Sequence, residues 1–194
     1  EKIAYHVLSQ SIIDNSTIPV TITPINLKNI KQFYNRPKVK KHSTEFSISR
    51  FLTPYLSNYK GYSLFLDCDF IMLGNVANLL KLVSKDKNKV LWCVKHREYI
   101  PKDKIKFLRE KQIPYKKKNW SSFMLFNNAK CKILTPKLVS RAHGLYLHQF
   151  KWTKEKFIGS LPKNWNILVG EQKFPKKINA LHYTLGGPYF KKHS

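Results

Sequence analysis

The amino-acid sequence predicts an α/β fold with a mostly parallel central sheet, built as one domain over residues 1–194. The length of 194 residues fits the roughly 100–200 residues that are usual for a domain. Hydrophobic residues make up 42% of the chain and aromatic residues 13%, which is enough for a packed core and excludes a disordered chain. Short apolar runs alternate with amphipathic segments, and this alternation favours strands layered against helices.

The first sixty residues predict a helix, a strand and a second helix. Apolar residues recur at helical spacing over residues 4–15, whereas β-branched residues alternate over 19–25, as is typical of a strand. A second helix is expected to begin at Glu45, because the Ser-Thr pair before it can cap its N-terminus. Pro54 is expected to kink or end that helix.

The middle of the chain predicts strand, helix and strand. Residues 62–66 form a short apolar run between a glycine and charged residues, which suits a buried strand. Asp67-Cys68-Asp69 follows at its C-terminal end. A helix is expected over 76–83 with Asn75 as its cap, and a strand over 90–95.

The second half predicts three more strands and one more helix. A strand is expected over residues 122–126, and Thr135-Pro136 is a good helix start. The aromatic stretch 143–161 is expected to be rich in loops, and 164–169 and 179–182 are expected to be short strands. Strands that alternate with helices in this way imply a largely parallel sheet.

The chain is strongly basic, with 36 Lys and Arg against 11 Asp and Glu and a formal net charge of +25. Such a field attracts polyanions, whether nucleic acid, anionic lipid head groups or phosphorylated substrates. The lysines are spread along the sequence, and the motif spacings of zinc fingers and of RNA-binding sheets are absent. Charge alone leaves these three partners open.

The three cysteines, Cys68, Cys93 and Cys131, are widely separated and odd in number. This spacing argues against a disulfide framework and against a structural zinc site. Reduced thiols in a cytoplasmic protein are therefore expected.

Asp67 and Asp69 are the most informative pair in the sequence, because they lie two residues apart between apolar segments. Burial of carboxylates is costly unless they are paired or bind a metal. In an extended segment residues i and i+2 point the same way, so their oxygens converge on a site suited to Mg²⁺ or Mn²⁺. The alternative is a surface turn with two solvated carboxylates.

Several segments resemble nucleotide-sugar glycosyltransferases of the GT-A fold, in particular family 8 and its bacterial relatives. The segment 67–69 resembles their Asp-x-Asp signature, and 49–56 resembles the Arg-bearing helix ahead of it. The segment 121–127 resembles the strand that lines the sugar pocket, and 181–188 the C-terminal His-Gly-Pro segment. The resemblance implies a Rossmann-like transferase fold. Its first strand, which holds the nucleotide base in such folds, is expected to be missing, because the chain starts on a helix; the alternatives are that an N-terminal piece lies outside this sequence or that the base site is incomplete.

The resemblance implies that Asp67 and Asp69 ligate a metal ion that bridges the two phosphates of the donor, with His182 as the third ligand. An imidazole beside two carboxylates favours Mn²⁺ over Mg²⁺. The alternative for His182 is a structural role as a half-buried residue at a strand end.

Other positions are expected to contact the donor phosphates. Arg50 carries a guanidinium fork that matches phosphate oxygens, although a surface salt bridge with Glu45 is the alternative. Gly186 and Gly187 would let the backbone approach the diphosphate, or else form an ordinary turn. Lys191 would replace the phosphate-binding lysine of the related enzymes.

A further set of polar residues is expected on the sugar and acceptor side. Ser122 belongs to the strand that lines the sugar pocket, and Asn127 and Asn128 are expected to bind sugar hydroxyls, with a simple turn as the alternative. Gln149 matches a glutamine near the anomeric carbon, and Glu171 is expected near the sugar or in a hairpin turn. Further candidates for the acceptor side are His148, Trp165 and Asn166.

The expected activity is metal-dependent transfer of a hexose, with retention, from a nucleotide diphosphate sugar, UDP-linked, to an acceptor hydroxyl. The donor and metal side is expected around 44–75 and 180–192, and the acceptor side around 119–172. The acceptor would be a glycan or glycolipid, and the basic surface would contact an anionic membrane at its cytoplasmic face. Nucleic acid is not expected as a partner. The alternatives are an inactive sugar-binding or nucleotide-binding relative, a basic nucleic-acid-binding domain, and a metal-dependent phosphoesterase, for which 11 acids are few.

Overall fold

The chain opens on helix α1 (Lys2–Asp14), as its periodicity predicts. The structure, a computed structural model, describes residues 2–36, 45–96 and 116–187. The strand expected over 19–25 is wrong, because these residues pair with no other strand and lead into the 3₁₀ turn η1 (Leu27–Ile30). Ile22 packs against the core cluster that contains Phe70 and Met72, but the segment makes no strand pairing in the described structure, and β-propensity alone does not make a strand.

The second helical segment consists of three short pieces in one run: α2 (Glu45–Ser49), η2 (Arg50–Leu52) and α3 (Thr53–Leu56). Pro54 lies in the first turn of α3, where its missing N–H group costs nothing. The break that the proline was expected to cause therefore takes the form of the 3₁₀ turn before it. The expected cap at residues 43–44 lies outside the described residues.

The larger sheet has the order β1-β4-β3-β5. Its strands are β1 (Tyr62–Leu66), β4 (Phe123–Asn127), β3 (Leu91–Val94) and β5 (Ile158–Leu161). Strand β4 is antiparallel to β1 and β3, whereas β5 is parallel to β3. Three of the four strands therefore run the same way, which confirms the mostly parallel sheet, and β4 opposes them.

A smaller sheet has the order β2-β7-β6, with β2 (Phe70–Met72), β7 (Ala180–His182) and β6 (Ile167–Leu168). Strand β7 is antiparallel to β2 and parallel to β6. The sequence predicts β6 and β7 but not β2, which has only three residues. Strand β2 follows β1 after the three residues 67–69, so this turn joins the two sheets.

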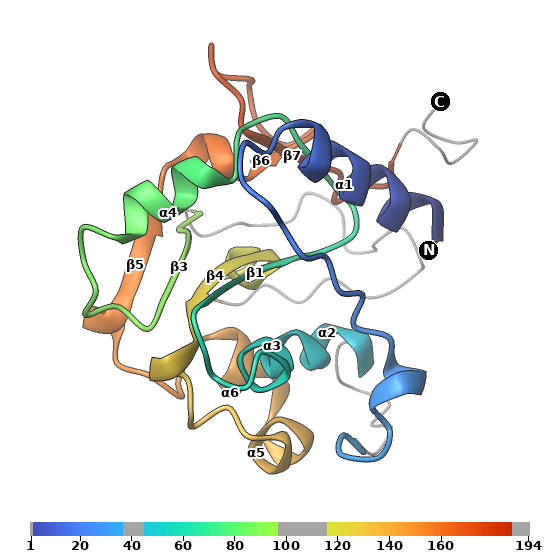
Figure 1. The fold of residues 1–194 in the computed structure, drawn as a ribbon, viewed down its shortest axis with the longest axis vertical. Helices are drawn as coiled ribbons and strands as arrows, with labels where there is room; N and C mark the ends of the chain where they lie inside the picture. The colour runs from blue at the N-terminus through green and yellow to red at the C-terminus, as the bar shows by residue number, and fades with distance from the viewer. Residues whose placement is uncertain (1, 37–44, 97–115, 188–194) are drawn as a thin grey trace.

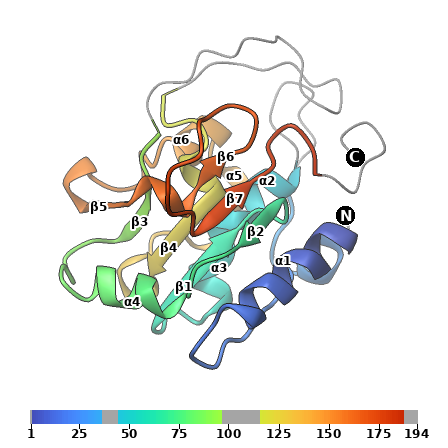
Figure 2. The same ribbon diagram turned by 90° about the horizontal axis from the view of Figure 1, so that it is seen from above.

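Helices cover both faces of the larger sheet (Figures 1 and 2). Along β3, Leu91 and Cys93 belong to one hydrophobic cluster, and Trp92 and Val94 to the other. The first cluster packs under the α2–η2 segment, α5 (Pro136–Arg141) and α6 (Gly144–His148), and the second under α1 and α4 (Ala77–Val83). Strict alternation along the buried strands thus produces a three-layer arrangement.

The region 143–161 contains more regular structure than its sequence predicts, since it includes α6 and β5. Helix α6 has only five residues, and β5 contains Gly159, which lowers strand propensity. A Cβ atom at Gly159 would lie 2.1 Å from the Trp92 indole, so the glycine lets β5 pair closely with β3. The remaining short turns are η3 (Trp120–Ser122), η4 (Asn128–Lys130), η5 (Glu155–Phe157) and η6 (Lys163–Trp165).

Among the described residues, none of the helices has the length and apolar character that crossing a bilayer requires. The three cysteines are all free thiols, and Cys93 and Cys131 are buried. Burial raises the pKa of each of these two thiols to about 12, so both stay protonated and unreactive.

Candidate functional site

The turn between β1 and β2 is held by both sheets. The backbone N–H of Asp67 donates to the carbonyl of Ser122 at 3.0 Å and extends the pairing of β1 with β4. The carbonyl of Asp69 accepts from the N–H of Tyr183 at 2.9 Å and extends the pairing of β2 with β7. The two carboxylates are therefore positioned by backbone hydrogen bonds on either side of the junction.

Asp67, Asp69 and His182 meet at this junction. Each offers a ligand atom, and the three atoms lie within 4.8 Å of one another. The register of β2 with β7 places Phe70 opposite His182, and the two rings stack with centroids 4.1 Å apart. The structure thus brings together the three residues that the sequence predicts as metal ligands.

Arg50 pairs with Asp67 through both carboxylate oxygens. Its Nη2 lies 2.8 Å from Oδ1, and its Nη1 donates to Oδ2 at 3.0 Å. Nη1 also donates to the carbonyl of Ser121, and Nε donates to the carbonyl of Ser47. The Arg50 side chain is 7% exposed and that of Asp67 24%, so this is a bidentate ion pair with a buried arginine and a partly exposed carboxylate.

This pairing changes the interpretation of Arg50. The sequence offers a phosphate contact or a surface salt bridge with Glu45, and the side chain of Glu45 lies outside the described part of the structure. The guanidinium instead contacts Asp67 and two carbonyls, and it lies 5.0 Å from the centre of the Phe65 ring. Arg50 fixes the orientation of Asp67, which is a predicted metal ligand.

The surroundings shift the pKa values of the two carboxylates in opposite directions. Burial raises the pKa of Asp67, and this effect outweighs the opposing charge of Arg50. Burial also acts to raise the pKa of Asp69, but the neighbouring His182 and hydrogen bonding more than compensate, so its pKa is lowered. Asp69 is thus the carboxylate that stays ionised most readily.

The residues fit a divalent cation. Oδ1 of Asp69 is buried and has no hydrogen-bond partner within the described ranges, although Nε2 of His182 lies 3.4 Å away. A protonated His182 is an ion-pair partner for this oxygen, whereas a neutral ring protonated on Nδ1 offers it no donor. Each oxygen of Asp67 keeps a free lone pair beside its bond to Arg50. One cation bound by two carboxylates and one imidazole would satisfy all three groups.

Ser122 and Asn166 form a chain of hydrogen bonds that ends at Nδ1 of His182. The hydroxyl of Ser122 donates to the carbonyl of Asn119 at 2.7 Å, and it lies 3.1 Å from Nδ2 of Asn166. Oδ1 of Asn166 lies 3.0 Å from Nδ1 of His182. Asn166 is completely buried, and its described hydrogen bonds are made within the protein, so its role on the acceptor side stays a prediction.

Glu171 follows β6 in the turn whose Gly170 has a φ of +79°, a value that favours glycine. Its Oε1 accepts from the hydroxyl of Thr184 at 2.6 Å, and its Oε2 is a buried atom without a partner in the described structure. Thr184 lies two residues after His182, so Glu171 is at the end of β7 that carries the histidine. Gly186 has a φ of +116°, which a side chain rarely tolerates.

His148 and Gln149 lie at the C-terminal end of α6. Nδ1 of His148 is 2.8 Å from the hydroxyl of Ser121, whose carbonyl accepts from Arg50. His148 is therefore a buried residue of the packing behind the site, whereas Gln149 is half-buried. Lys191 lies outside the described residues.

Asn127 and Asn128 do not reach this site. The antiparallel register pairs Asn127 with Tyr62 at the start of β1, whereas Phe123 pairs with Leu66 beside the aspartates. Four residues of strand separate the two ends, roughly 13 Å. The expectation that the two asparagines bind sugar hydroxyls stays a prediction, and the direction of β4 places them at the end of the strand away from the three predicted metal ligands.

Asn128 has a structural role that mutation can reveal. Its Nδ2 donates to the carbonyl of Lys60 and to the hydroxyl of Ser63, each at 2.8 Å, and the residue is completely buried. Asn128→Ala is expected to lower the free energy of unfolding by about 1–3 kcal/mol, because these partners lose their hydrogen bonds. Urea denaturation measures this loss, with Asn127→Ala as the matched control. A change in affinity for a nucleotide sugar without a loss of stability would contradict this role.

His96 is a residue at this edge that the sequence did not single out. It follows β3, and its Nδ1 lies 3.3 Å from Nε2 of Gln172, while its Nε2 is buried and has no partner in the described structure. Burial, helped by the charge of His182, lowers the pKa of His96 to about 4. A lone histidine after a strand carries no signal in the sequence.

The lowered pKa of His96 predicts acid sensitivity. Between pH 6.5 and about 4 the unfolded chain binds a proton at this histidine and the folded chain does not, so stability falls as the pH falls. The loss due to this residue is expected to reach about 3 kcal/mol at pH 4. Urea denaturation from pH 7.5 to 4 should show a shallower slope for His96→Gln than for the exposed-site control His6→Gln. Identical slopes in the two variants would refute the assignment.

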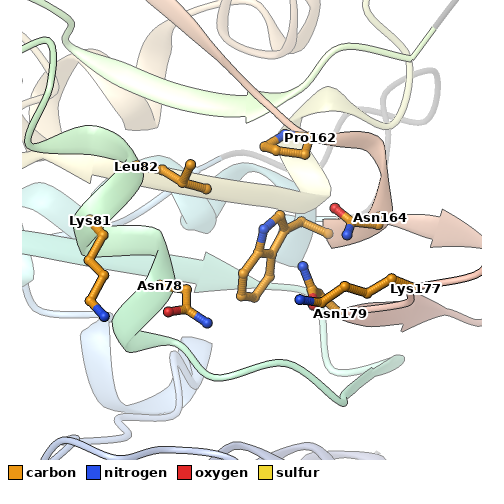
Figure 3. A pocket seen from close by; sticks show the side chains of 8 residues that line it. Asn78, Lys81, Leu82, Pro162, Asn164, Lys177 and Asn179 are labelled. Atoms are coloured by element: carbon orange, nitrogen blue, oxygen red, sulfur yellow. The ribbon is translucent and has the colours of Figure 1, made fainter.

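A pocket of about 410 Å³ lies at the other end of β7 (Figure 3). It is lined by Asn78, Lys81, Leu82, Pro162, Asn164, Trp165, Lys177 and Asn179. The backbone carbonyl of Asn179 accepts from the N–H groups of Leu73 and Gly74, just beyond β2. The pocket is therefore separate from the three predicted metal ligands.

Comparison with known proteins places the chain in a family. It is 42% identical over 199 residues to Protein CDI of Arabidopsis thaliana, an alignment that covers 98% of this chain and 76% of that protein. No protein-family model matches the chain. Among solved structures, the bifunctional glycosyltransferase WbbM matches with a TM-score of 0.50 and 15% identity, over 79% of this chain and 34% of WbbM.

A second solved structure covers more of both chains. A glycosyltransferase involved in glycosylation of the major capsid of PBCV-1 matches over 97% of this chain and 90% of its own, with a TM-score of 0.49 and 12% identity. The match to WbbM shows the α/β fold of GT-A glycosyltransferases. With that fold, the chain belongs to the family of Protein CDI of Arabidopsis thaliana.

Proposed function

We propose that the protein is a metal-dependent glycosyltransferase that moves a hexose from a UDP-sugar to an acceptor hydroxyl, with retention of the anomeric configuration. The observation that carries this proposal is the convergence of Asp67, Asp69 and His182 at the C-terminal end of β1 in a GT-A fold. Ligands of open α/β sheets bind beyond the carboxyl ends of the strands, where this cluster lies.

Asp67, Asp69 and His182 would hold the cation, and the nitrogen ligand favours Mn²⁺ over Mg²⁺. The bound ion supplies positive charge against the diphosphate leaving group. Arg50 keeps the carboxylate of Asp67 in a fixed orientation through its two-point contact. The protein would thus provide a fixed ligand set for the cation, and the transfer proposed below requires no dedicated nucleophile.

In the transfer itself, the bond between the anomeric carbon and the phosphate oxygen breaks, and a bond to the acceptor oxygen forms. The acceptor's proton passes to the departing phosphate oxygen on the same face of the sugar. Glu171 is proposed to accept a hydrogen bond from a sugar hydroxyl through Oε2, and Gln149 to contact the anomeric region. Gly186 and Gly187, together with Lys191, are proposed to contact the diphosphate.

A panel of nucleotide sugars with and without Mn²⁺ tests the proposal. We expect one donor, UDP-linked, to be hydrolysed slowly in the presence of the ion, with release of UDP. Asp69→Asn is the matched inactive control. Donor binding without turnover, even with an acceptor glycan added, would indicate an inactive relative, and binding of no nucleotide sugar would contradict the proposal altogether.

The net charge of +25 supports a second element of the proposal, contact with an anionic membrane that carries a glycolipid acceptor. Each Lys or Arg near such a surface contributes about 1 kcal/mol of attraction. Flotation with vesicles that contain an anionic lipid, compared with neutral vesicles, tests this contact. Equal recovery with both vesicle types would contradict it.

A further inference from the structure

Asn166 occupies a position from which it can set the protonation of His182. It is completely buried and lies directly behind the histidine ring, with Oδ1 3.0 Å from Nδ1. A neutral imidazole carries one proton, either on Nδ1 or on Nε2, and only the nitrogen without the proton can bind a metal. The partner of Nδ1 therefore determines whether Nε2 is available.

The orientation of the Asn166 amide is fixed by its other neighbours. The single hydroxyl proton of Ser122 goes to the carbonyl of Asn119, at 2.7 Å. The hydroxyl oxygen must then accept from its other neighbour, which is Nδ2 of Asn166 at 3.1 Å. The same Nδ2 lies 3.5 Å from the Asn119 carbonyl. The amide nitrogen thus faces Ser122, and the amide oxygen faces His182.

An amide oxygen can only accept, so Nδ1 of His182 must carry the proton and donate it to Asn166. In the neutral ring this leaves a lone pair on Nε2, which lies 3.4 Å from the buried Oδ1 of Asp69, an atom with no hydrogen-bond partner among the described residues. Two acceptors that face each other at this distance repel unless a cation or a proton lies between them.

We propose that Asn166 is a positioning residue that holds His182 in the Nδ1–H tautomer, so that Nε2 presents its lone pair to a divalent cation beside Asp69. A chain of hydrogen bonds supports this histidine from outside the ligand set. It runs from the Asn119 carbonyl through the Ser122 hydroxyl to the Asn166 amide. Such partners of a ligating histidine are typically worth 10–100-fold in metal affinity. This inference rests on the proposed metal-dependent function.

The test uses two readouts that do not require glycosyl transfer. Long-range ¹H–¹⁵N correlation spectra of the metal-free protein, recorded at an alkaline pH where the imidazole is neutral, report the tautomer of His182, assigned by comparison with His182→Gln. Calorimetry with Mn²⁺ reports metal affinity. We expect the Nδ1–H tautomer in the wild-type protein, and loss of that tautomer with roughly 10–100-fold weaker Mn²⁺ binding in Asn166→Leu.

Two further variants make the test specific. Asn166→Asp keeps an acceptor for Nδ1–H and is expected to keep both the tautomer and Mn²⁺ binding, so it also covers the case in which Asn166→Leu does not fold. Asn164→Leu is the matched control two residues away; its side chain lines the separate pocket (Figure 3) and should leave both readouts unchanged.

The outcomes separate this inference from the proposed function. An Nε2–H tautomer in the wild-type protein, or unchanged Mn²⁺ affinity in a folded Asn166→Leu, would overturn the role of Asn166 while the metal site stands. Loss of both tautomer and affinity in Asn166→Asp would also overturn it. If the wild-type protein binds no Mn²⁺, both the metal-dependent function and this inference fail.

Discussion

Asp69→Asn is expected to abolish Mn²⁺-dependent binding of UDP, with a loss of at least about 100-fold in affinity, corresponding to several kcal/mol. The substitution preserves shape and removes the negative charge. Asp69 is the carboxylate with the lowered pKa, and its Oδ1 is the buried atom without a partner. No other carboxylate among the described residues is placed with Asp67 and His182 to replace it.

Calorimetry with UDP at a fixed Mn²⁺ concentration measures this loss. Asp86→Asn is the matched control, because it removes one charge from a partly exposed acid whose described contacts are an ion pair with Lys89 and a hydrogen bond from the N–H of Asn88. The fold should survive Asp69→Asn, since the backbone carbonyl of residue 69 still accepts from Tyr183. Unchanged UDP affinity in the presence of Mn²⁺ would falsify the assignment of Asp69 as a metal ligand.

Arg50→Met is expected to lower the free energy of unfolding by about 3–5 kcal/mol, the range for breaking one side of a buried ion pair. The variant leaves the Asp67 carboxylate without its partner, and the carbonyls of Ser47 and Ser121 without their donor. Urea denaturation gives the size of the loss. Arg141→Met, an exposed arginine on α5, is the control and should cost little.

A double-mutant cycle identifies the cause of the loss. Asp67→Asn removes the charge that Arg50 faces, so Arg50→Met with Asp67→Asn should be less destabilised than the sum of the two single variants. A strictly additive result would show that Arg50 acts through the carbonyls of Ser47 and Ser121 and the Phe65 ring rather than through the ion pair.

Patterns local in the sequence predict much of this fold. Strand β1 and helix α1 follow from apolar periodicity, and Asp67 and Asp69 follow from two acids in an apolar setting. Strand β2 and helix α6 were missed because three to five residues are too few to show a period. The expected strand over 19–25 failed because strands form only with a partner, and partners are set by tertiary structure.

The residues of the candidate site likewise divide into those that local sequence predicts and those that only tertiary structure brings together. His182 was placed with the aspartates through a family resemblance, and no spacing rule connects residues that lie more than a hundred positions apart. The partnership of Arg50 with Asp67, and of Asn166 with His182, depends on which side chains the two sheets bring into contact. The distance of Asn127 from the aspartates depends on the direction of β4, which decides which end of the strand meets the site.

The turn that joins the two sheets has a consequence for how the molecule opens. The smaller sheet contributes few backbone hydrogen bonds of its own, and elements of this kind open at lower free energy than a central sheet. A cation bound between the β1–β2 turn and the end of β7 would tie the opening of the small sheet to that of the large one. Without a donor the two sheets would open separately, whereas with a donor bound they would open as one cooperative unit. The amide hydrogens of Asp67 and Tyr183 would then exchange with solvent at the same rate.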